Sequence, residues 1–581
     1  MQNKIDIKTF LLNNQIDFLI LKNTNEFFSE YLPQKQQFIK AISGFSGSNA
    51  TIIFTKYKNY FFTDGRYLLQ AKQQLNKAIF EIVDTSVWQW LQQHCQDKQK
   101  IAMVDSFVSI DEWQKYNQIN KNIILIDKKA IDPLEHFWSN TEISDIFTCA
   151  DDICGATSWQ KRQKIIEQHP NKTFFISSSE NICWLLNLRG KDLLNTPIFF
   201  CFAILQPDKQ VILFANIDNK KQLLLKKQKI KVVPLNEMTA FLNLFSTNNN
   251  QIYSDFSTTN CNIYNILLKN NFIIYKQNCP ITIAKAIKNP AEIAGAIKSC
   301  YQDGIALNKF LYWLQTKFNK KESISEFTAQ QYLAFLRRQS PDFFYESFDA
   351  ISAFAENGAI IHYKCNPNTN LLMKSNSLYL IDSGGQYLGN DFYGTTDITR
   401  TIAIDKPSDA MILHYTLVLK GHIALARSKF PKGTTGSNID ALARFYLWQF
   451  GLDYAHGTGH GIGSFLSVHE GPCAISKNNQ QPLLPGMILS NEPGFYLGNN
   501  YGIRLENMIL VKEYNEDFLC FETISLAPFD FNLIDTKMLT YPEKKWLNDY
   551  HQLILQKIGN NLDEKEQEWL KNILSQFKSL T

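Results

Sequence analysis

The stretch HGTGHGIGSFLSVHEGP, residues 456–472, holds three of the ten histidines in a chain of 581 residues. Glycine recurs at 457, 459, 461 and 463, and each of these four would cost a helix about 1 kcal/mol relative to alanine. His456 and His460 therefore do not form the paired zinc ligands of a helix, a motif that also needs glutamate where Gly457 stands. We predict a loop or strand whose backbone approaches a ligand closely, so a metal at His460 needs further ligands from elsewhere.

Two aspartates occur in segments that are predicted to be neighbouring strands. In SLYLIDSGGQY, Asp382 ends an apolar run before a Gly-Gly turn. In GTTDITRTIAI, the alternation of residues puts Asp397, Thr399 and Thr401 on one face of a strand. We predict that the two strands pair and bring Asp382 and Asp397 together.

Two glutamates have similar surroundings further along the chain. In PGMILSNEPGFY, Glu492 lies between an apolar strand and a Pro-Gly turn. In GIRLENMILV, Glu506 lies inside an otherwise apolar strand. A carboxylate beside such runs is costly to bury unless it is paired or bound to a cation.

These four carboxylates and His460 form a set too acidic to pack together without a positive partner. Two divalent ions about 3.5–4 Å apart fit such a set, and its oxygen-rich composition suits Mn(II), Co(II) or Zn(II). Taken singly, each group has an ordinary interpretation, with Asp382 as a turn cap and Asp397 or Glu506 as partners of nearby arginines. The order of the five groups, each in its own strand-turn setting, favours the metal site.

Length and composition limit the classes of protein that fit. A 45% hydrophobic, 20% charged chain of 581 residues is typical of a globular protein with several domains. The net charge of +4 is small for this length, so we expect no nucleic acid and no membrane as partners. The start of the chain lacks a signal-like apolar region, the apolar run at 197–205 is too short to span a bilayer, and the eleven cysteines lack paired spacing. We therefore expect a cytoplasmic location.

We predict an α/β (α+β) fold class with four parts. Their boundaries are 1–150, 151–288, 289–525 and 526–581. Strand-like runs at 17–21, 49–55 and 59–63 alternate with helical ones, and the second part repeats this plan. The third part starts with a helix of about seven turns, capped by Asn289 and with Pro290 at its first position. The fourth part has apolar residues at helical spacing.

Six motifs, in this order, resemble those of the superfamily that contains creatinase, prolidase, methionine aminopeptidase and aminopeptidase P. They are IDSGGQY, GTTDITRT, HGTGHGIG, VHEGP, SNEPGFY and GIRLEN. The front of the chain, with GFSGSNATIIFT, FFTDGRYLLQA and ENICWLLNLRG, is similar to the first two domains of the three-domain, cytosolic type of Xaa-Pro aminopeptidase. The resemblance covers nearly the whole chain. It implies two creatinase-like α/β domains, a pita-bread catalytic domain and a helical C-terminal extension.

The resemblance also implies how the five groups divide two metal ions between them. Asp382 would bind one ion, while Asp397 and Glu506 would bridge both. His460 and Glu492 would complete the coordination of the second ion. The metal implied is Mn(II), with Co(II) or Zn(II) as alternatives.

Further residues acquire catalytic roles from the same resemblance. Glu492 would also be the general base, and His469 would stabilise the scissile carbonyl oxygen as it becomes an oxyanion. His362, in GAIIHY, and His456 would line the substrate side of the site. Arg504 would orient the first aspartate ligand or shape the pocket.

The implied reaction is the hydrolysis of the bond between an N-terminal residue and a penultimate proline, by a water activated between two metals. Its substrates would be peptides with proline at the second position, and we expect a homodimer in which the C-terminal helices take part. A prolidase that acts on Xaa-Pro dipeptides would also fit. A non-catalytic pita-bread binding module fits less well, because such a module would have lost ligands. Creatinase chemistry also fits less well, because it needs no metal.

Two departures from the family's pattern concern the candidate site. The segment SGGQYLGNDFYGTT, before Asp397, is about four residues longer than usual, so it could narrow the site, and Asp391 could be mistaken for the ligand. We prefer Asp397 because the GTTDITRT motif around it is intact. After His362 the chain has YKCNP, where Cys365 lacks an evident activating base and is not expected to be a nucleophile.

Overall fold

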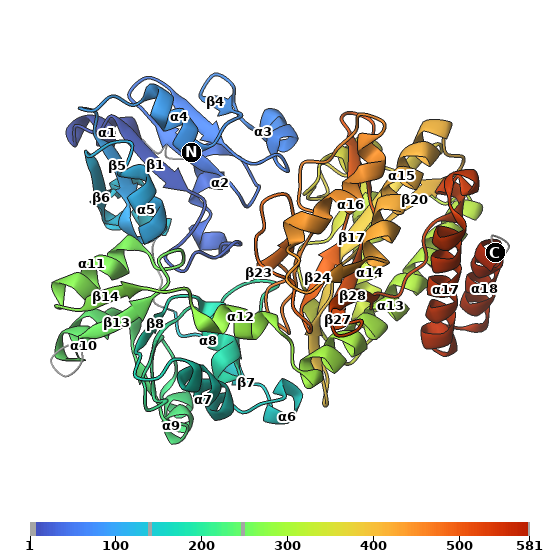
Figure 1. Ribbon diagram of the computed structural model, residues 1–581. Helices are drawn as coiled ribbons and strands as arrows, with labels where there is room; N and C mark the ends of the chain where they lie inside the picture. The colour runs from blue at the N-terminus through green and yellow to red at the C-terminus, as the bar shows by residue number, and fades with distance from the viewer. Residues whose placement is uncertain (1–6, 138–141, 246–249, 579–581) are drawn as a thin grey trace. The chain divides into compact units, whose positions relative to one another are not determined.

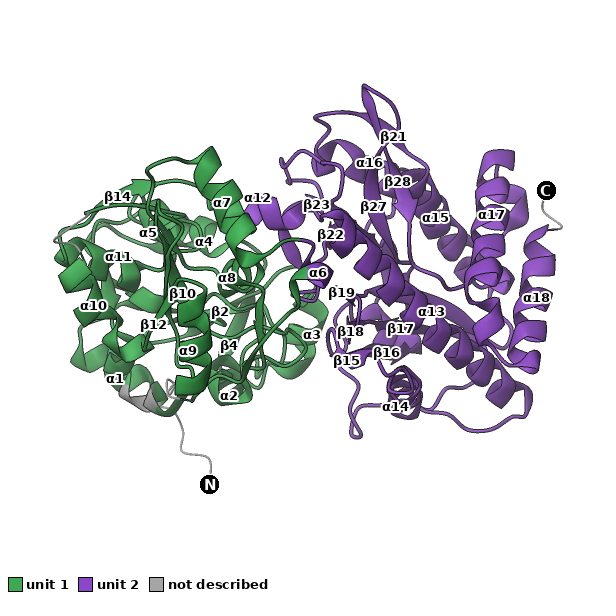
Figure 2. Ribbon diagram, turned by 90° about the horizontal axis from the view of Figure 1, so that it is seen from below, with its two compact units in different colours: residues 1–151, 156–281 green, residues 152–155, 282–581 purple. Residues whose placement is uncertain are grey.

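The structure is a computed structural model (Figure 1) that describes residues 7–137, 142–245 and 250–578. It divides into two compact units, unit 1 (1–151 and 156–281) and unit 2 (152–155 and 282–581) (Figure 2). The chain passes from unit 1 into unit 2 within helix α12 (Pro280–Ala286).

Unit 1 contains two six-stranded sheets with the same topology. The orders are β4-β3-β2-β1-β5-β6 and β12-β11-β10-β8-β13-β14. In each sheet the first strand pairs antiparallel with the second and parallel with the fifth, and the third pairs parallel with the fourth. This agreement confirms the predicted repeat. The strands are β1 (Phe18–Lys22), β2 (Thr51–Phe54), β3 (Asn59–Phe62), β4 (Phe80–Val83), β5 (Ile101–Val104), β6 (Ile123–Ile126), β8 (Phe174–Ile176), β10 (Phe202–Leu205), β11 (Val211–Phe214), β12 (Ile230–Val233), β13 (Gln251–Ser254) and β14 (Ile273–Lys276).

The first sheet is buried on both faces. Successive side chains of a strand point to opposite faces, so each strand contributes to two clusters. Leu19 and Leu21 of β1 pack into a cluster with α1, α2 and α3, whereas Phe18 and Ile20 pack into a cluster with α4 and α5. A short pair, β7 (Ile146–Thr148) with β9 (Leu188–Gly190), lies outside the two large sheets. The helices before α12 are α1 (Ile7–Asn13), α2 (Phe38–Ser43), α3 (Leu68–Gln74), α4 (Val87–His94), α5 (Ile110–Tyr116), α6 (Asp151–Cys154), α7 (Ser158–Gln168), α8 (Ser179–Leu186), α9 (Asn219–Lys227), α10 (Met238–Phe245) and α11 (Cys261–Lys269).

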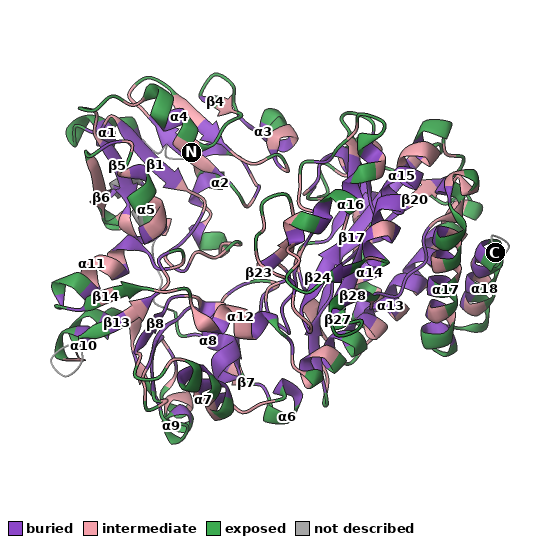
Figure 3. Cartoon of the chain, viewed as in Figure 1, coloured by how far each residue is buried: buried purple, intermediate pink, exposed green. Residues whose placement is uncertain are grey.

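Unit 2 combines several sheets with long helices. Its largest sheet has the order β21-β28-β27-β24-β22-β23, and smaller sheets are β15-β18-β19, β16-β17-β20 and β25-β26. Buried residues concentrate on these strands (Figure 3). The strands are β15 (Phe343–Glu346), β16 (Ile351–Phe354), β17 (Ser377–Ser383), β18 (Gly385–Leu388), β19 (Tyr393–Thr395), β20 (Ile398–Ile404), β21 (Lys429–Pro431), β22 (Gly459–Gly461), β23 (Glu470–Ile475), β24 (Ile488–Asn491), β25 (Gly494–Leu497), β26 (Tyr501–Arg504), β27 (Asn507–Glu513) and β28 (Phe518–Thr523).

The first long helix of unit 2 begins where the sequence predicts. The Asn289 side chain accepts hydrogen bonds from the backbone N–H groups of Ala291 and Glu292, and the Glu292 carboxylate accepts one from the N–H of Asn289. At 30 residues, α13 is longer than the predicted seven turns. The helices here are α13 (Pro290–Asn319), α14 (Glu326–Arg337), α15 (Asp409–Ala426) and α16 (Gly436–Trp448).

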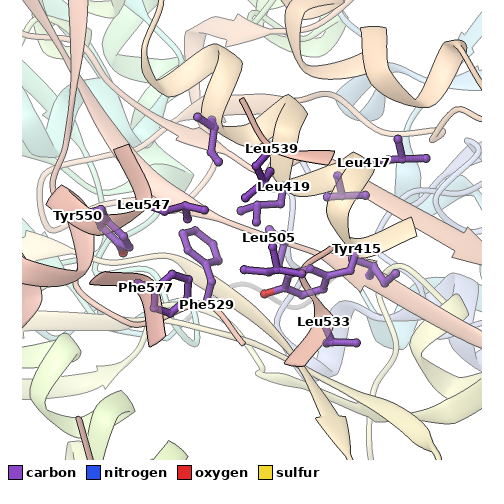
Figure 4. Close-up of a cluster of buried hydrophobic side chains, with 14 of the residues drawn as sticks. Tyr415, Leu417, Leu419, Leu505, Phe529, Leu533, Leu539, Leu547, Tyr550 and Phe577 are labelled. Carbon is purple, nitrogen blue, oxygen red and sulfur yellow. The ribbon is translucent and has the colours of Figure 1, made fainter. Parts of the chain in front are cut away.

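The C-terminal extension is helical, as predicted, and packs into unit 2. It consists mainly of α17 (Tyr541–Ile558) and α18 (Glu564–Lys578). Leu547, Tyr550 and Phe577 lie in one buried cluster with Tyr415 of α15 and Phe529 (Figure 4). The apolar faces of both helices are therefore part of the core. Within residues 7–137, 142–245 and 250–578, no helix has both the length and the hydropathy to cross a bilayer.

Candidate active site

Strand pairing brings the two predicted aspartates together. β17 and β20 pair antiparallel with Asp382 opposite Thr399, and Asp397 directly precedes β20. The predicted pairing is confirmed, but the connection is more than a hairpin turn, because β18 and β19 between them form a separate sheet with β15. Both aspartates are buried.

His460 lies in the three-residue strand β22, so the expectation of a non-helical segment is confirmed. Its Nδ1 is 3.0 Å from the carbonyl oxygen of Gly461, which can only accept, so Nδ1 carries the proton. Nε2 faces the acids, 3.4 Å from Oδ2 of Asp397 and 3.5 Å from Oε1 of Glu492. In a metal-ligating histidine one ring nitrogen usually donates to a carbonyl, carboxylate or water, which leaves the other nitrogen to bind the metal.

Glu506 occupies a break between two strands. The prediction that it lies inside one strand is wrong, since β26 ends at Arg504 and β27 begins at Asn507. Its Oε2 accepts a hydrogen bond of 2.8 Å from Thr399, and its carbonyl oxygen accepts one of 2.6 Å from Arg400. Ligand atoms of Asp397, His460 and Glu506 all lie within 4.8 Å of one another.

Arg504 is the cation that the fold itself supplies to this site. Its Nη2 donates to Oδ2 of Asp382 at 2.6 Å, and its Nη1 donates to the Tyr496 hydroxyl at 2.7 Å. That hydroxyl is 2.9 Å from Nε2 of His456. Tyr496 thus connects two residues that the sequence placed at the site, although it was not itself predicted to lie there. Its position in β25, four residues after Glu492, could have indicated it.

The remaining predicted histidines lie on two different segments. The His469 ring centroid is 4.4 Å from that of His460, with the rings edge to face. His362 is partly exposed in the turn after the short helix η6 (Ala355–Ala359). Gly358 of η6 approaches Gly502 of β26 so closely that a Cβ on Gly502 would lie 1.7 Å from the Gly358 carbonyl oxygen. The segment that carries His362 is therefore held against the strand that ends at Arg504.

The four carboxylates and His460, called the acidic cluster from here on, are incompletely satisfied by the protein. No described residue offers a hydrogen bond to the buried atoms Oδ1 of Asp382 and Oε1 of Glu506. Burial and the neighbouring carboxylates raise the pKa of Glu506 well above its usual range, and burial raises that of Glu492 to about 7. Burial lowers the pKa of His460, but Asp397 and Glu492 outweigh it and raise the value to about 9. This donor set fits divalent cations.

Glycine is required where the backbone of the opening stretch is crowded. A Cβ on Gly459 would lie 2.0 Å from the carbonyl oxygen of Ser490 in β24, and one on Gly461 would lie 2.3 Å from that of Glu470 in β23. Larger residues would separate β22 from its neighbouring strands. The glycines therefore allow His460 to lie between two strands of the sheet.

A buried network that was not predicted from the sequence fixes the loop before β22. Arg444 of α16 donates to the carboxylate of Asp440 at 2.7 Å and to the carbonyl oxygens of Tyr454 and His456 at 2.8 and 2.7 Å. Thr458 donates to the other Asp440 oxygen at 2.6 Å. These contacts hold the backbone on both sides of His456.

The lengthened segment between the two aspartates makes contacts with α13. Asp391 is exposed and pairs with Lys298 of that helix, and the aromatic ring of Phe392 lies 5.6 Å from the same ammonium. These contacts identify Asp391 as a surface residue. Burial raises the pKa of the Cys365 thiol to about 12, in line with the expectation that it is not a nucleophile.

Comparisons with known proteins agree with this arrangement. Residues 296–513 match the model of metallopeptidase family M24, residues 10–132 and 139–292 match creatinase/prolidase N-terminal domain models, and residues 517–576 match the C-terminal region of peptidase M24. The class defined by fold and site is thus a metallopeptidase with creatinase-type N-terminal domains.

Full-length relatives narrow this class. The chain is 35% identical to Xaa-Pro aminopeptidase 1 of Dictyostelium discoideum, over 97% of this chain and 95% of that protein. It is 34% identical to the probable Xaa-Pro aminopeptidase P of Coprinopsis cinerea, over 97% and 96%. The chain therefore belongs to the Xaa-Pro aminopeptidase P group of metallopeptidase family M24.

A solved structure is similar over nearly the whole chain. It is that of X-prolyl aminopeptidase from Caenorhabditis elegans, described as a cytosolic enzyme with a di-nuclear active site. The TM-score is 0.89 at 30% identity, and the match covers 96% of this chain and 95% of that one. The X-Pro aminopeptidase of Thermotoga maritima, with a TM-score of 0.51 at 21% identity, shares the fold over 64% of this chain.

Proposed function

We propose that the protein is a metal-dependent Xaa-Pro aminopeptidase that releases the N-terminal residue of peptides with proline in second position. The observation that carries this proposal is the acidic cluster, with buried carboxylate oxygens that no described residue satisfies. The non-catalytic alternative predicts a loss of ligands, and all five are present. Similarity to aminopeptidases over 97% of the chain favours this activity over that of a prolidase.

We assign the acidic cluster to two divalent metal ions, Mn(II) first, with Co(II) or Zn(II) as alternatives. Asp382 would hold one ion, Asp397 and Glu506 would bridge both, and His460 and Glu492 would hold the second. When bound, the ions supply a positive charge that acidifies a water molecule and polarises the scissile carbonyl. The rest of the 289–525 catalytic domain would position these ligands and the peptide.

The chain's own residues then bind, orient and move protons. Glu492 accepts the proton of the attacking water and passes it to the leaving proline nitrogen. His469 donates a hydrogen bond to the carbonyl oxygen as negative charge develops on it. His456 and His362 line the substrate side. Arg504 fixes the orientation of the first aspartate ligand through its 2.6 Å hydrogen bond.

The substrate bond explains why a dedicated site is needed. The amide before proline carries no N–H, so a pocket that relies on an N–H donor loses that contact. A pocket that accepts the pyrrolidine ring and holds the carbonyl through His469 does not depend on it. Selectivity for proline would follow from the shape of the pocket.

We also propose a homodimer that works in the cytoplasm. The C. elegans protein is described as cytosolic, which supports the location. The apolar faces of α17 and α18 are buried in unit 2, whereas Leu442, Phe445 and Trp448 of α16 and Phe450 after it are exposed. Exposed apolar side chains at three-residue spacing along one helix support an interface at α16. A monomer in sedimentation at micromolar concentration would contradict the dimer.

A metal-dependent digest tests the activity. The protein is stripped of metal, restored with Mn(II), and offered Arg-Pro-Pro, Arg-Pro and Arg-Ala-Ala together, with products measured by mass spectrometry. Release of arginine from Arg-Pro-Pro, and only with metal, is the expected result. Cleavage of Arg-Pro alone would show a prolidase instead. No cleavage with Mn(II), Co(II) or Zn(II) would overturn the proposal.

A further inference from the structure

A second buried group of charges lies in unit 2, beside the strand that follows His469. Lys285 Nζ is 2.6 Å from Oε2 of Glu470, and Lys288 Nζ is 2.5 Å from Oε1 of the same residue. The side chains of Lys285, Lys288 and Glu470 are 3%, 1% and 0% exposed. We call these three residues the lysine–glutamate triad.

In the triad, unlike in the acidic cluster, both carboxylate oxygens have partners within the group. Each oxygen of its carboxylate has its own ammonium group, and ammonium groups have no lone pair with which to ligate a metal. Apolar replacements of buried ion triads are often neutral or stabilising, because the desolvation of three charges offsets much of their attraction. Stability alone therefore does not account for this triad.

What the triad holds is the backbone next to His469. Glu470 is the next residue along the chain and the first residue of β23. A Cβ on Gly461 would lie 2.3 Å from the Glu470 carbonyl oxygen, and one on Gly463 would lie 3.1 Å from its Oε2. The fixed Glu470 thus lies against both glycines that flank Ile462, with its backbone carbonyl at Gly461 and its carboxylate at Gly463.

The lysines come from a segment that is itself fixed. Lys285 lies near the end of α12, and the backbone N–H of Lys288 donates to the carbonyl oxygen of Gly486 at 3.0 Å. Gly486 lies two residues before β24, whose last residue, Asn491, precedes Glu492. The triad therefore connects the segment with Lys285 and Lys288, at the start of unit 2, to two segments of the site. One carries His469, and the other carries Glu492.

We propose that Lys285 and Lys288 are positioning residues that act through Glu470 to hold the His469 imidazole at the scissile carbonyl. They touch neither substrate nor reacting atoms. This inference rests on the proposed function, because it assigns a consequence to the orientation of His469. It makes the segment that enters unit 2 part of the catalytic apparatus.

The test compares two apolar replacements. The variant Lys285→Met/Lys288→Met/Glu470→Met removes the triad without leaving an unpaired charge. We expect it to keep its metal content and its KM for Arg-Pro-Pro within about twofold, while kcat falls about tenfold through misorientation. The matched control is Lys420→Met/Glu543→Met, a buried pair at 2.7 Å that joins α15 to α17, which should keep the wild-type kcat.

A double-mutant cycle separates positioning from general damage. In a His469→Ala background, removal of the triad should lower kcat by less than about twofold, because the residue it positions is gone. An equal loss in both backgrounds, or none in either, would overturn the inference. Full activity of His469→Ala would overturn its premise, and an inactive wild type would overturn the proposed function itself.

A measurement without turnover gives a second readout. In histidine-labelled, metal-free protein, the His469 ring resonance, assigned by its loss in His469→Ala, should shift or broaden when the triad is removed and stay in place in the control pair. An unchanged resonance would count against the inference. If the triple variant does not fold, Lys288→Met alone retains the neutral Lys285–Glu470 pair, and a smaller kcat loss with the same resonance shift is expected.

Discussion

The acidic cluster and the lysine–glutamate triad are both buried in unit 2, yet they differ in how their charges are balanced. In the triad, every carboxylate oxygen has an ammonium partner. In the acidic cluster, His460 and the neighbouring Arg504 face four carboxylates, and two buried oxygens have no partner among the described residues. Burial alone therefore does not mark a ligand site. A shortage of positive charge and of hydrogen-bond donors does, because each buried carboxylate needs a partner.

The largest effect is expected when the acidic cluster loses a carboxylate. Asp397→Asn should lower kcat on Arg-Pro-Pro by at least about a thousandfold, because an amide oxygen is a weaker metal ligand and carries no charge. Metal content measured by mass spectrometry should fall as well, while the circular dichroism spectrum stays that of the wild type.

Asp391→Asn is the matched control for this change. Asp391 lies six residues earlier and is exposed beside Lys298. The activity and metal content of the Asp391→Asn variant should therefore equal those of the wild type. Near-normal turnover by Asp397→Asn with added Mn(II), or a comparable loss in Asp391→Asn, would contradict the ligand assignment.

His551 is a buried histidine without a neighbouring carboxylate among the described residues, in contrast to His460. Acidic neighbours raise the pKa of His460, whereas burial lowers the pKa of His551 to about 3. Between pH 6.5 and 3 the unfolded chain therefore binds a proton at His551 that the folded protein does not. Stability falls as pH falls through this range, by roughly 2 kcal/mol for one such group between pH 7 and pH 5.

Urea denaturation of the metal-free protein at pH 7 and pH 5 checks this sign and size. In His551→Leu the loss of unfolding free energy between the two pH values should be smaller than in the wild type by roughly 2 kcal/mol. Equal losses in the two proteins would show that His551 takes up a proton in the folded state.

Local patterns in the sequence were enough to predict some features and not others. The Asn289–Pro290 helix start, the pairing of the two strands that bring Asp382 and Asp397 together and the non-helical setting of His460 follow from alternation, capping and glycine content. The break at Glu506 does not, because GIRLENMILV is apolar on both sides of it. The break depends on hydrogen bonds from Thr399 and Arg400.

Contacts between distant segments account for the other omissions. The partners in the lysine–glutamate triad are 185 and 182 residues apart, and Arg400 is bound by Tyr550 of the C-terminal extension. No periodicity links such pairs, since they meet only after the sheets and helices have packed. The same holds for Tyr496, whose role depends on the positions of Arg504 and His456 in the folded protein.

The smallest expected effect concerns Arg504, which donates to Asp382 of the acidic cluster. Arg504 divides its donors between Asp382 and the Tyr496 hydroxyl, so Tyr496→Phe leaves one buried N–H and Nε2 of His456 without that partner. We expect kcat/KM for Arg-Pro-Pro to fall about tenfold, because outer partners of metal ligands typically contribute 10- to 100-fold.

Tyr501→Phe offers a control in the neighbouring strand. The Tyr501 hydroxyl lies 2.9 Å from Nδ1 of His414, a residue outside the acidic cluster, so its loss should leave kcat/KM unchanged. If both variants lose activity equally, the effect belongs to the β25–β26 pair as a whole. If only Tyr496→Phe does, the orientation of Arg504 matters as well as its charge, because one guanidinium orients Asp382 but cannot neutralise all four carboxylates of the acidic cluster.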